Sequence, residues 1–197
     1  MLPNTESSHL KSYLISLSMA YLNPNSNYLL IFLLCLSLTP LLTSANHKPV
    51  HFHFYMQEKV SEPNATSIVV AKGPIALPGT PYRFGDIAVI DNALTQGPDP
   101  TSSLVGRAQG IFTVMKSDPS VNWVFNIVFA YGKYNGSTVT VQGRDAITQP
   151  MRELSVVGGS GLFRMAQGYL LIKTYSVNIA NGDAVLELDL YVYPFKG

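Results

Sequence analysis

The chain has 197 residues, with 13 lysines and arginines against 12 aspartates and glutamates, so its formal net charge is +1 at pH 7. This balance gives no electrostatic basis for binding nucleic acid or an anionic membrane surface. Hydrophobic residues make up 47% of the chain, which excludes intrinsic disorder, and the length is that of a single domain.

The N-terminal part of the chain has the pattern of a secretory signal. Residues 28–42 (YLLIFLLCLSLTPLL) form an apolar run of signal-peptide length, shorter than the roughly 20 residues that span a membrane. Small residues follow, and we expect cleavage after Ala45, with an uncleaved anchor as the alternative. Met19 is a possible internal start that would leave a signal of conventional length. We therefore divide the chain into a signal peptide, 1–45, and one domain, 46–197.

Two further features of the sequence bear on whether the protein is secreted. The only cysteine, Cys35, lies within the predicted signal, so the mature domain has neither a disulfide nor a thiolate metal site. Asn64 and Asn135 each begin an N-glycosylation sequon, NAT and NGS, beside turn-forming residues. Together with the signal, these sequons predict a secreted glycoprotein that has no membrane segment after cleavage.

The mature chain has the pattern of consecutive β-strands. Apolar stretches alternate with segments rich in Gly, Pro, Asn and Asp at 73–81, 96–100, 156–161 and 178–183. Several of the stretches exceed ten residues, which is natural in a barrel. We predict an all-β fold, a closed eight-stranded antiparallel barrel with a central pocket, with strands at 51–60, 67–72, 85–91, 104–116, 121–131, 137–145, 162–175 and 184–193.

Side-chain parity places two carboxylates on apolar faces of these strands. Glu58 shares one face of the first strand with Phe54, and Asp145 ends a strand on the side of its valines. A carboxyl group desolvated among apolar groups has a raised pKa and can transfer a proton near neutrality. The alternative is that the two acids pair with Arg144 or Arg152. Arg152 itself either anchors a phenol or carboxylate of a ligand or is a surface arginine.

The strand predicted at 104–116 suggests room for a ligand. Its small residues Gly106, Ala108 and Gly110 lie on the same face as Phe112. If this face is interior, they leave volume unfilled, and a barrel of about eight strands is just wide enough to hold one small ligand. The sequence therefore predicts a mostly apolar small-molecule pocket with two acids.

No metal or cofactor site is expected from the sequence. His51 and His53 are two residues apart, so they point to one face of a strand and could in principle chelate a metal ion. No third ligand stands near them in the sequence. All histidines of the mature domain precede residue 54, so a Ser–His–Asp triad is not predicted either.

Four segments resemble the plant dirigent proteins: HFHFYMQE (51–58), LVGRAQGIF (104–112), NGSTVTVQGRD (135–145) and MRELSVVGGSGLFRMAQGY (151–169). They occur in order across about residues 48–194. The resemblance implies an eight-stranded antiparallel barrel of the allene oxide cyclase type, secreted and glycosylated. It also implies a homo-oligomer, usually a trimer, with a dimer as the other possibility.

The resemblance also implies an activity. Dirigent proteins act in the plant apoplast, where they impose stereoselectivity on the coupling of two phenoxy radicals, such as those of coniferyl alcohol, in lignan and phenylpropanoid biosynthesis. A separate laccase or peroxidase supplies the radicals. Some relatives instead close rings, as in pterocarpan synthesis, through quinone methides.

Matched position by position, four residues fall on pocket residues of the family. We expect Glu58, Asp145 and Arg152 to be catalytic, through general acid–base chemistry in a desolvated pocket, and Thr174 to contact the substrate.

The remaining expected substrate contacts include departures from the family pattern. Phe54, Phe112 and Val114 complete the predicted set, and the last two stand where lignan-forming members commonly have tyrosines. Gln57 and Glu58 replace a His–Asp pair, and the disulfide cysteines of the family are missing. These changes resemble the dirigent-like branch of the family.

Three functions are therefore kept open. The first, which we expect over an autonomous enzyme, is a stereodirecting protein for phenoxy-radical coupling. The second is a cyclase or lyase that uses Glu58 or Asp145 as an acid on a hydroxylated isoflavonoid or similar alcohol. The third is a non-catalytic cell-wall or defence protein that binds lignin precursors or glycans.

Overall fold

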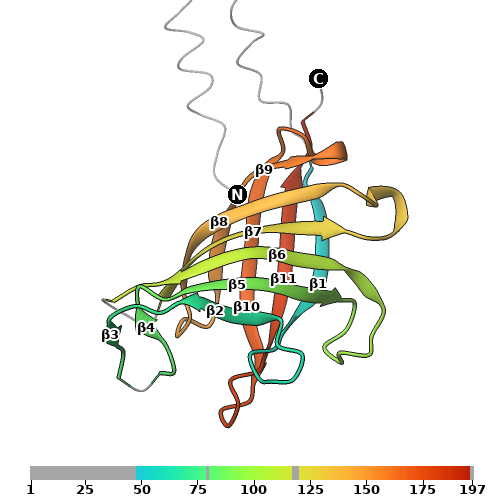
Figure 1. Ribbon diagram of the computed structural model, residues 1–197. Coiled ribbons are helices and arrows are strands. Elements are labelled where there is room, and N and C mark those ends of the chain that lie inside the picture. Colours follow the sequence, from blue (N-terminus) through green and yellow to red (C-terminus); the bar gives the residue numbers. More distant parts are fainter. Residues whose placement is uncertain (1–47, 79, 117–119, 196–197) are drawn as a thin grey trace, which may run out of the picture. The chain divides into compact units, whose positions relative to one another are not determined.

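The computed structural model describes residues 48–78, 80–116 and 120–195, and these form an almost entirely β domain (Figure 1). The predicted signal peptide, with Met19, Cys35 and Ala45, lies outside the described residues. The elements, in chain order, are β1 (Val50–Glu58), β2 (Ser67–Ala71), β3 (Ile75–Ala76), β4 (Arg83–Phe84), β5 (Ile87–Thr95), β6 (Leu104–Val114), β7 (Ser120–Phe129), η2 (Gly132–Tyr134), β8 (Thr138–Ala146), β9 (Arg152–Ser160), η3 (Gly161–Phe163), β10 (Gln167–Val177) and β11 (Ala184–Tyr193).

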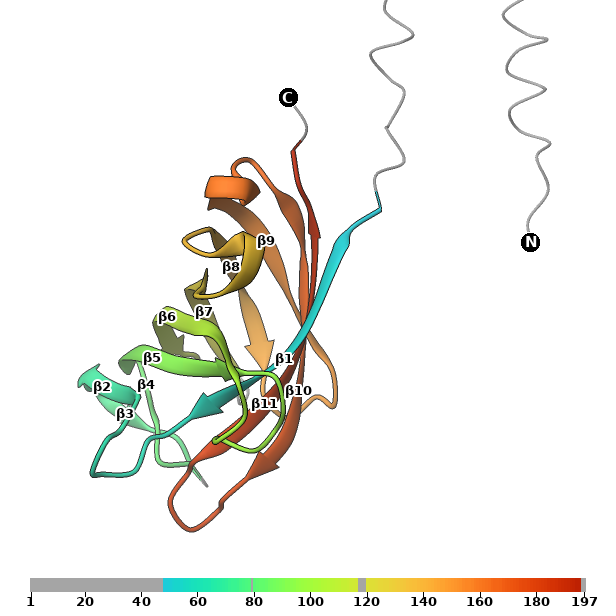
Figure 2. The ribbon, with the colours of Figure 1, turned by 90° about the vertical axis from the view of Figure 1, so that its right-hand side faces the viewer.

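The sheet closes into the predicted eight-stranded antiparallel barrel. Its strands follow the order β1–β11–β10–β9–β8–β7–β6–β5, and β1 then pairs with β5 to complete the ring. Figure 2 shows β1 running diagonally from beside β11 toward β5 and β2. β1 pairs with β11 along its whole length, whereas its pairing with β5 covers only Tyr55–Gln57.

The membership of the ring differs from the sequence prediction. Segment 67–72 forms β2, which pairs with β5 and lies outside the ring of eight. Segment 156–161, expected to separate strands, belongs mostly to β9, and the strand predicted from residue 162 begins at Gln167. The glycines of this segment are compatible with a strand because a β-bulge shifts the register opposite Thr140 and Val141.

The predicted face assignments are confirmed. Phe54 and Met56 of β1, Ala108 and Phe112 of β6 and Val141 of β8 are all buried in the barrel interior. The hydrophobic core is therefore the filled inside of the barrel, as alternation of side chains along each strand requires.

The glycines of β6 do not leave space for a ligand. A Cβ atom on Gly110 would lie 2.2 Å from the carbonyl oxygen of Val124 on the adjacent strand β7. Gly110 thus allows β7 to approach closely, and the expectation that this stretch creates the cavity is wrong.

One end of the barrel is closed by aromatic rings. Phe52 of β1, Phe129 of β7, Tyr134 of η2 and Phe163 of η3 have ring centroids 4.9–6.0 Å apart. We call these four residues the aromatic plug. The two short 3-10 turns bring two of its rings over the strand ends, so the interior is sealed on this side.

The described residues contain no helix that is both long enough and apolar enough to cross a membrane.

Candidate functional site

A pocket of about 230 Å³ lies at the barrel end opposite the aromatic plug. The strands reach this end at Glu58, Val121, Asp145, Arg152 and Leu186. Its walls are apolar except for a small polar group, and its lining comprises Glu58, Tyr82, Phe112, Val121, Trp123, Asp145, Ile147, Arg152, Thr174, Val177, Ala184 and Leu186. This composition is that of a small-molecule site.

The polar side of the pocket is built on a buried ion pair. Arg152 donates from Nε to Oδ1 of Asp145 at 2.9 Å, and the two side chains are 3% and 1% exposed. The Nη1 of Arg152 donates to the hydroxyl of Thr174 at 2.9 Å and to the carbonyl of Gln149 at 3.4 Å. Of the alternatives that the sequence left open, the pairing of Asp145 with Arg152 is present, and a surface position for Arg152 is wrong.

The local fold explains this arrangement. Asp145 lies near the end of β8 and Arg152 begins β9, so the turn between these two strands brings the side chains together. Burial raises the pKa of Asp145, and the charge of Arg152 and its hydrogen bond oppose that rise. A buried pair of this kind fixes both side chains, because breaking it would leave an uncompensated charge inside the protein.

Glu58 ends β1 and is the second acid of the pocket. Burial raises its pKa from an ordinary 4.5 to about 7, a hydrogen bond with Ser67 acts against the rise, and the charges of Asp145 and Asp183 add to it. Both protonation states of Glu58 are therefore populated near neutral pH. A carboxyl group in this condition can give a proton and take one back.

Tyr82 is a pocket residue that the sequence analysis missed. Its ring packs edge-on against Phe112, with centroids 5.9 Å apart, and it is partly buried. Burial raises the pKa of Tyr82 to about 12, with further contributions from Glu58 and Asp86, so its phenol stays protonated. In the sequence, the only feature that could have pointed to Tyr82 is that it is an aromatic residue within a segment rich in Gly and Pro.

A buried carboxylate holds the segment that carries Tyr82. Asp86 accepts hydrogen bonds from the backbone N–H groups of Gly73, at 2.8 Å, and Arg83, at 2.7 Å. These bonds join the two ends of the excursion that contains β3 and β4. Asp86 therefore keeps Tyr82 at the pocket without touching the pocket itself.

An aromatic wall completes the pocket. Phe112 and Trp123 lie on adjacent strands with ring centroids 5.1 Å apart. The indole N–H of Trp123 favours the ionised form of Asp145, yet within the described part of the chain it makes no hydrogen bond of normal geometry. Trp123 therefore both packs against the neighbouring strand and faces the cavity.

The structure brings together most of the predicted site residues but not all. Glu58, Asp145, Arg152, Phe112 and Thr174 line the pocket. Phe54 and Val114 are buried in the barrel core and do not line it.

A larger groove adjoins the pocket. It has a volume of about 780 Å³, lies between β2 and the turn 178–182, and shares Tyr82, Phe112 and Val177 with the pocket. The two spaces are therefore neighbours.

Both predicted glycosylation positions are exposed. Asn64 lies between β1 and β2, and Asn135 directly follows η2. Neither residue lines the pocket, so a glycan on either would not fill it.

The chain is similar to proteins of known type over nearly all of its described part. Residues 49–193 match the family described as Dirigent-like protein. Dirigent protein 1 of Arabidopsis thaliana is 43% identical over 83% of this chain and 92% of its own length. Pterocarpan synthase 1 of Glycyrrhiza echinata is 38% identical over 75% of this chain and 79% of its own length. The solved structure of the pterocarpan synthase dirigent protein GePTS1 matches with a TM-score of 0.72 and 38% identity, covering 79% of this chain and 90% of that one.

Proposed function

The chain belongs to the dirigent protein family, and from this premise we propose that its pocket directs the cyclisation of a phenolic alcohol, with Glu58 as the proton-transferring group. The observation that carries the proposal is the raised pKa of Glu58, about 7, in an apolar pocket beside a fixed ion pair. A neutral carboxyl group at physiological pH is what an acid-assisted loss of water requires.

The proposed reaction is a dehydration that needs no oxidant. The protonated carboxyl of Glu58 gives its proton to the hydroxyl group on the benzylic carbon of the substrate, and the carbon–oxygen bond breaks as water leaves. Loss of the proton of a conjugated phenol leaves a quinone methide. A second phenolic hydroxyl then adds to the same carbon and gives its proton to the Glu58 carboxylate, while the quinone oxygen regains a proton from solvent. The balance is one alcohol converted to one cyclic ether and water.

The other pocket residues would position the substrate. Arg152, held by Asp145 and Thr174, places a fixed positive charge beside the pocket that favours a partly ionised phenol oxygen. Phe112 and Trp123 would pack against the aromatic rings and select which face of the intermediate is attacked. The similarity to pterocarpan synthases supports a cyclisation.

Stereoselective coupling of phenoxy radicals is the second candidate function. The observation that favours it is the groove of about 780 Å³ beside the pocket of about 230 Å³, since two phenolic units could be held in neighbouring spaces. In this role a laccase or peroxidase supplies the radicals, with coniferyl alcohol as the model substrate, and the protein only orients them.

We also propose the setting in which either function operates. The predicted signal and the exposed Asn64 and Asn135 support a glycosylated protein of the apoplast. Family membership supports a homo-oligomer, a trimer in the first instance.

Product analysis tests the proposal. Mature protein is incubated with a hydroxylated isoflavanol in the absence of oxidant, and the cyclic ether is measured by chiral chromatography. We expect one enantiomer in excess, a rate that falls as the pH rises above about 7, and a loss of about 100-fold in Glu58→Gln. Glu153→Gln, which removes an exposed carboxylate from β9, is the matched control and should retain full activity.

A second assay separates the two candidates. Coniferyl alcohol and a laccase are incubated with and without the protein, and the enantiomeric excess of the lignan is measured. A non-racemic lignan without oxidant-free turnover would replace cyclisation by radical coupling. No turnover and a racemic lignan would contradict both for these substrate classes and leave a binding role.

A further inference from the structure

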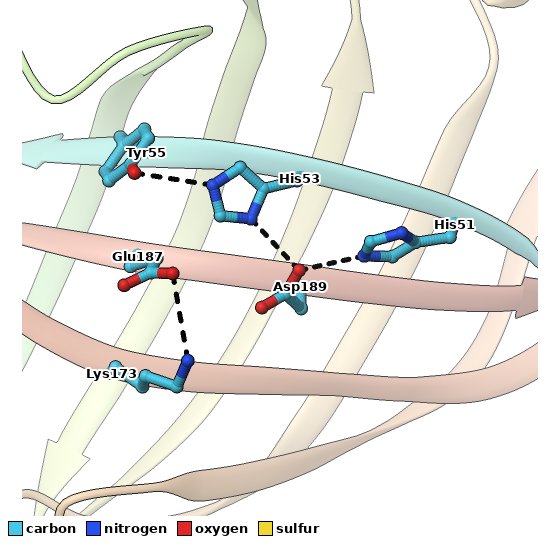
Figure 3. Close-up of polar contacts among 6 residues, drawn as sticks. All are labelled: His51, His53, Tyr55, Lys173, Glu187 and Asp189. Atoms are coloured by element: carbon cyan, nitrogen blue, oxygen red, sulfur yellow. Dashed lines mark hydrogen bonds and ion pairs between the residues drawn. The ribbon is translucent and has the colours of Figure 1, made fainter.

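A second group of ionisable side chains lies on the outer wall of the barrel, on β1 and β11 (Figure 3). Its members point away from the pocket, and the proposed function makes no use of them. We propose that this wall binds one divalent transition-metal ion, such as Zn²⁺ or Cu²⁺, through four side chains: His51, His53, Glu187 and Asp189.

Strand register brings these residues together. β1 and β11 are antiparallel, and His53 lies directly opposite Asp189. Side chains alternate along a strand, so His51 shares the face of His53, and Glu187 shares the face of Asp189. The third ligand that is missing near the histidines in the sequence is thus supplied by a strand that lies 136 residues further along the chain.

The distances are close to those of a metal site. Asp189 Oδ1 accepts from Nε2 of His51 at 2.8 Å and from Nδ1 of His53 at 3.0 Å. One ligand atom each of His53, Glu187 and Asp189 lie within 4.8 Å of one another. Ligand atoms about 2.1 Å from a tetrahedral ion are about 3.4 Å apart, so small side-chain rotations suffice to enclose one.

The ion would replace protons that now join these groups. Two imidazole nitrogens now share one carboxylate oxygen, and each ring would bind the ion through that nitrogen as the neutral tautomer that carries its proton on the other ring nitrogen. Asp189, whose Oδ1 both rings contact, would supply the charged oxygen ligand.

Neighbouring aromatic residues hold the histidine rings. His51 stacks on Tyr191, with ring centroids 4.4 Å apart and an angle of 12° between the ring planes. The Nε2 of His53 lies 3.4 Å from the hydroxyl of Tyr55, which leaves Nδ1 directed at Asp189. Hydrogen bonds to the second imidazole nitrogen commonly orient metal-binding histidines in this way.

The donor set indicates which ion is favoured. Two imidazoles with two carboxylates suit zinc and copper, whereas calcium and magnesium prefer oxygen ligands alone. One contact competes, because Nζ of Lys173 lies 3.7 Å from Oε1 of Glu187. This ion pair is partly exposed and its separation is long, so it is weak, and an ion that recruits Glu187 would displace it.

Metal titration of the mature, tag-free protein after treatment with a chelating resin tests the site. We expect ZnCl₂ to bind with one equivalent per chain in calorimetry and to raise the thermal unfolding temperature, since only the folded state holds the ligands together. Copper bound in its place should show nitrogen hyperfine structure from two imidazoles in electron paramagnetic resonance.

Variants make the test specific. His53→Gln and Asp189→Asn should each weaken zinc binding at least tenfold, while Lys173→Met should strengthen it several-fold by releasing Glu187. Asp91→Asn, which removes the carboxylate of the exposed pair with Arg107, should leave binding unchanged. Absence of saturable binding by the unmodified protein would overturn the proposal. So would equal affinity in His53→Gln and the unmodified protein, or no gain of affinity in Lys173→Met, a variant that keeps every ligand and is expected to fold.

Discussion

The two ends of the barrel are built from the same strands but are filled in opposite ways. At one end four aromatic rings and two short turns close the interior by packing ring against ring. At the other end the same alternation delivers Glu58, Asp145 and Arg152 to a cavity. The side chains at the closed end pack against one another, whereas those at the open end include the groups that could carry out chemistry. Changes at the closed end should therefore alter stability, and changes at the open end should alter activity and its pH dependence.

At the closed end, we expect the largest effect from a substitution that forces two adjacent strands apart. A Cβ on Gly168 would lie 1.9 Å from the carbonyl oxygen of Tyr191, so Gly168→Ala must displace β11 from β10. We expect the loss of stability to exceed about 4 kcal/mol and little folded protein to be recovered. Gly158 has nearly the same φ, +155° against +154°, but a Cβ there would meet nothing within 4 Å. Gly158→Ala should therefore remain foldable, and equal damage in the two variants would show that backbone strain, not close packing, is responsible.

Removal of one ring of the aromatic plug should have the second-largest effect on stability. Phe163 is fully buried against Phe52, Phe129 and Tyr134, so Phe163→Ala should lower the free energy of unfolding by about 3–5 kcal/mol in urea denaturation. The activity of the protein that remains folded should be unchanged. Leu162→Ala, at an adjacent exposed position, is the control and should have little effect on stability. A plug variant that loses activity while still folded would contradict the division between the two ends.

The buried ion pair at the open end should also contribute to stability. Arg152→Met leaves Asp145 buried without its partner, and we expect a loss of about 3 kcal/mol at pH 7, at the low end for buried pairs because both residues line a pocket. The loss should shrink at lower pH, where Asp145 in the variant becomes protonated. The double variant Arg152→Met with Asp145→Asn should recover part of the stability. Arg107→Met, which breaks the exposed pair with Asp91, should cost less than about 1 kcal/mol.

The smallest expected effect is the pH dependence contributed by Glu58. Its pKa is raised in the folded protein, from 4.5 to about 7, so the folded state binds more protons than the unfolded state between these values. This contribution to stability is present below about pH 4.5 and is lost as the pH rises to about 7. Because Glu58 is partly exposed, we expect a difference of about 2 kcal/mol between pH 4.5 and 7.5. Urea denaturation of Glu58→Gln across this range should lack that part of the slope, and an unchanged slope would contradict the assignment.

The sequence predicted the features that depend on strict alternation along a strand. The interior positions of Phe54, Phe112 and Asp145 and the direction of Glu58 follow from a period of two residues, and the structure has each of them on the expected face. The fold class followed from the same pattern, whereas the ring of eight followed from the family motifs, because the pattern counted β2 and missed β9.

The features that were missed depend on contacts between distant segments. The glycine-rich stretch at the end of β9 has the composition of a turn, and only its pairing with β8 makes it a strand. The choice between Arg144 and Arg152 as the partner of Asp145, which the sequence left open, depends on where that strand begins. Tyr82 lies in a loop whose path is set by Asp86, and Asp189 meets the two histidines only through the register of β1 and β11.

Because β1 pairs only in part with β5, the backbone hydrogen bonds are distributed unevenly around the barrel. Hydrogen bonds between these strands cover only Tyr55–Gln57, and beyond them β5 pairs with β2 instead. This short seam is the least costly place for the barrel to open locally, because fewer backbone bonds have to break there than between any two fully paired strands. Since Glu58 directly follows the seam, such local opening would widen the entrance of the pocket while the aromatic plug remains packed. Fast amide hydrogen exchange along this seam would identify it as the route by which a bulky ligand enters and leaves the pocket.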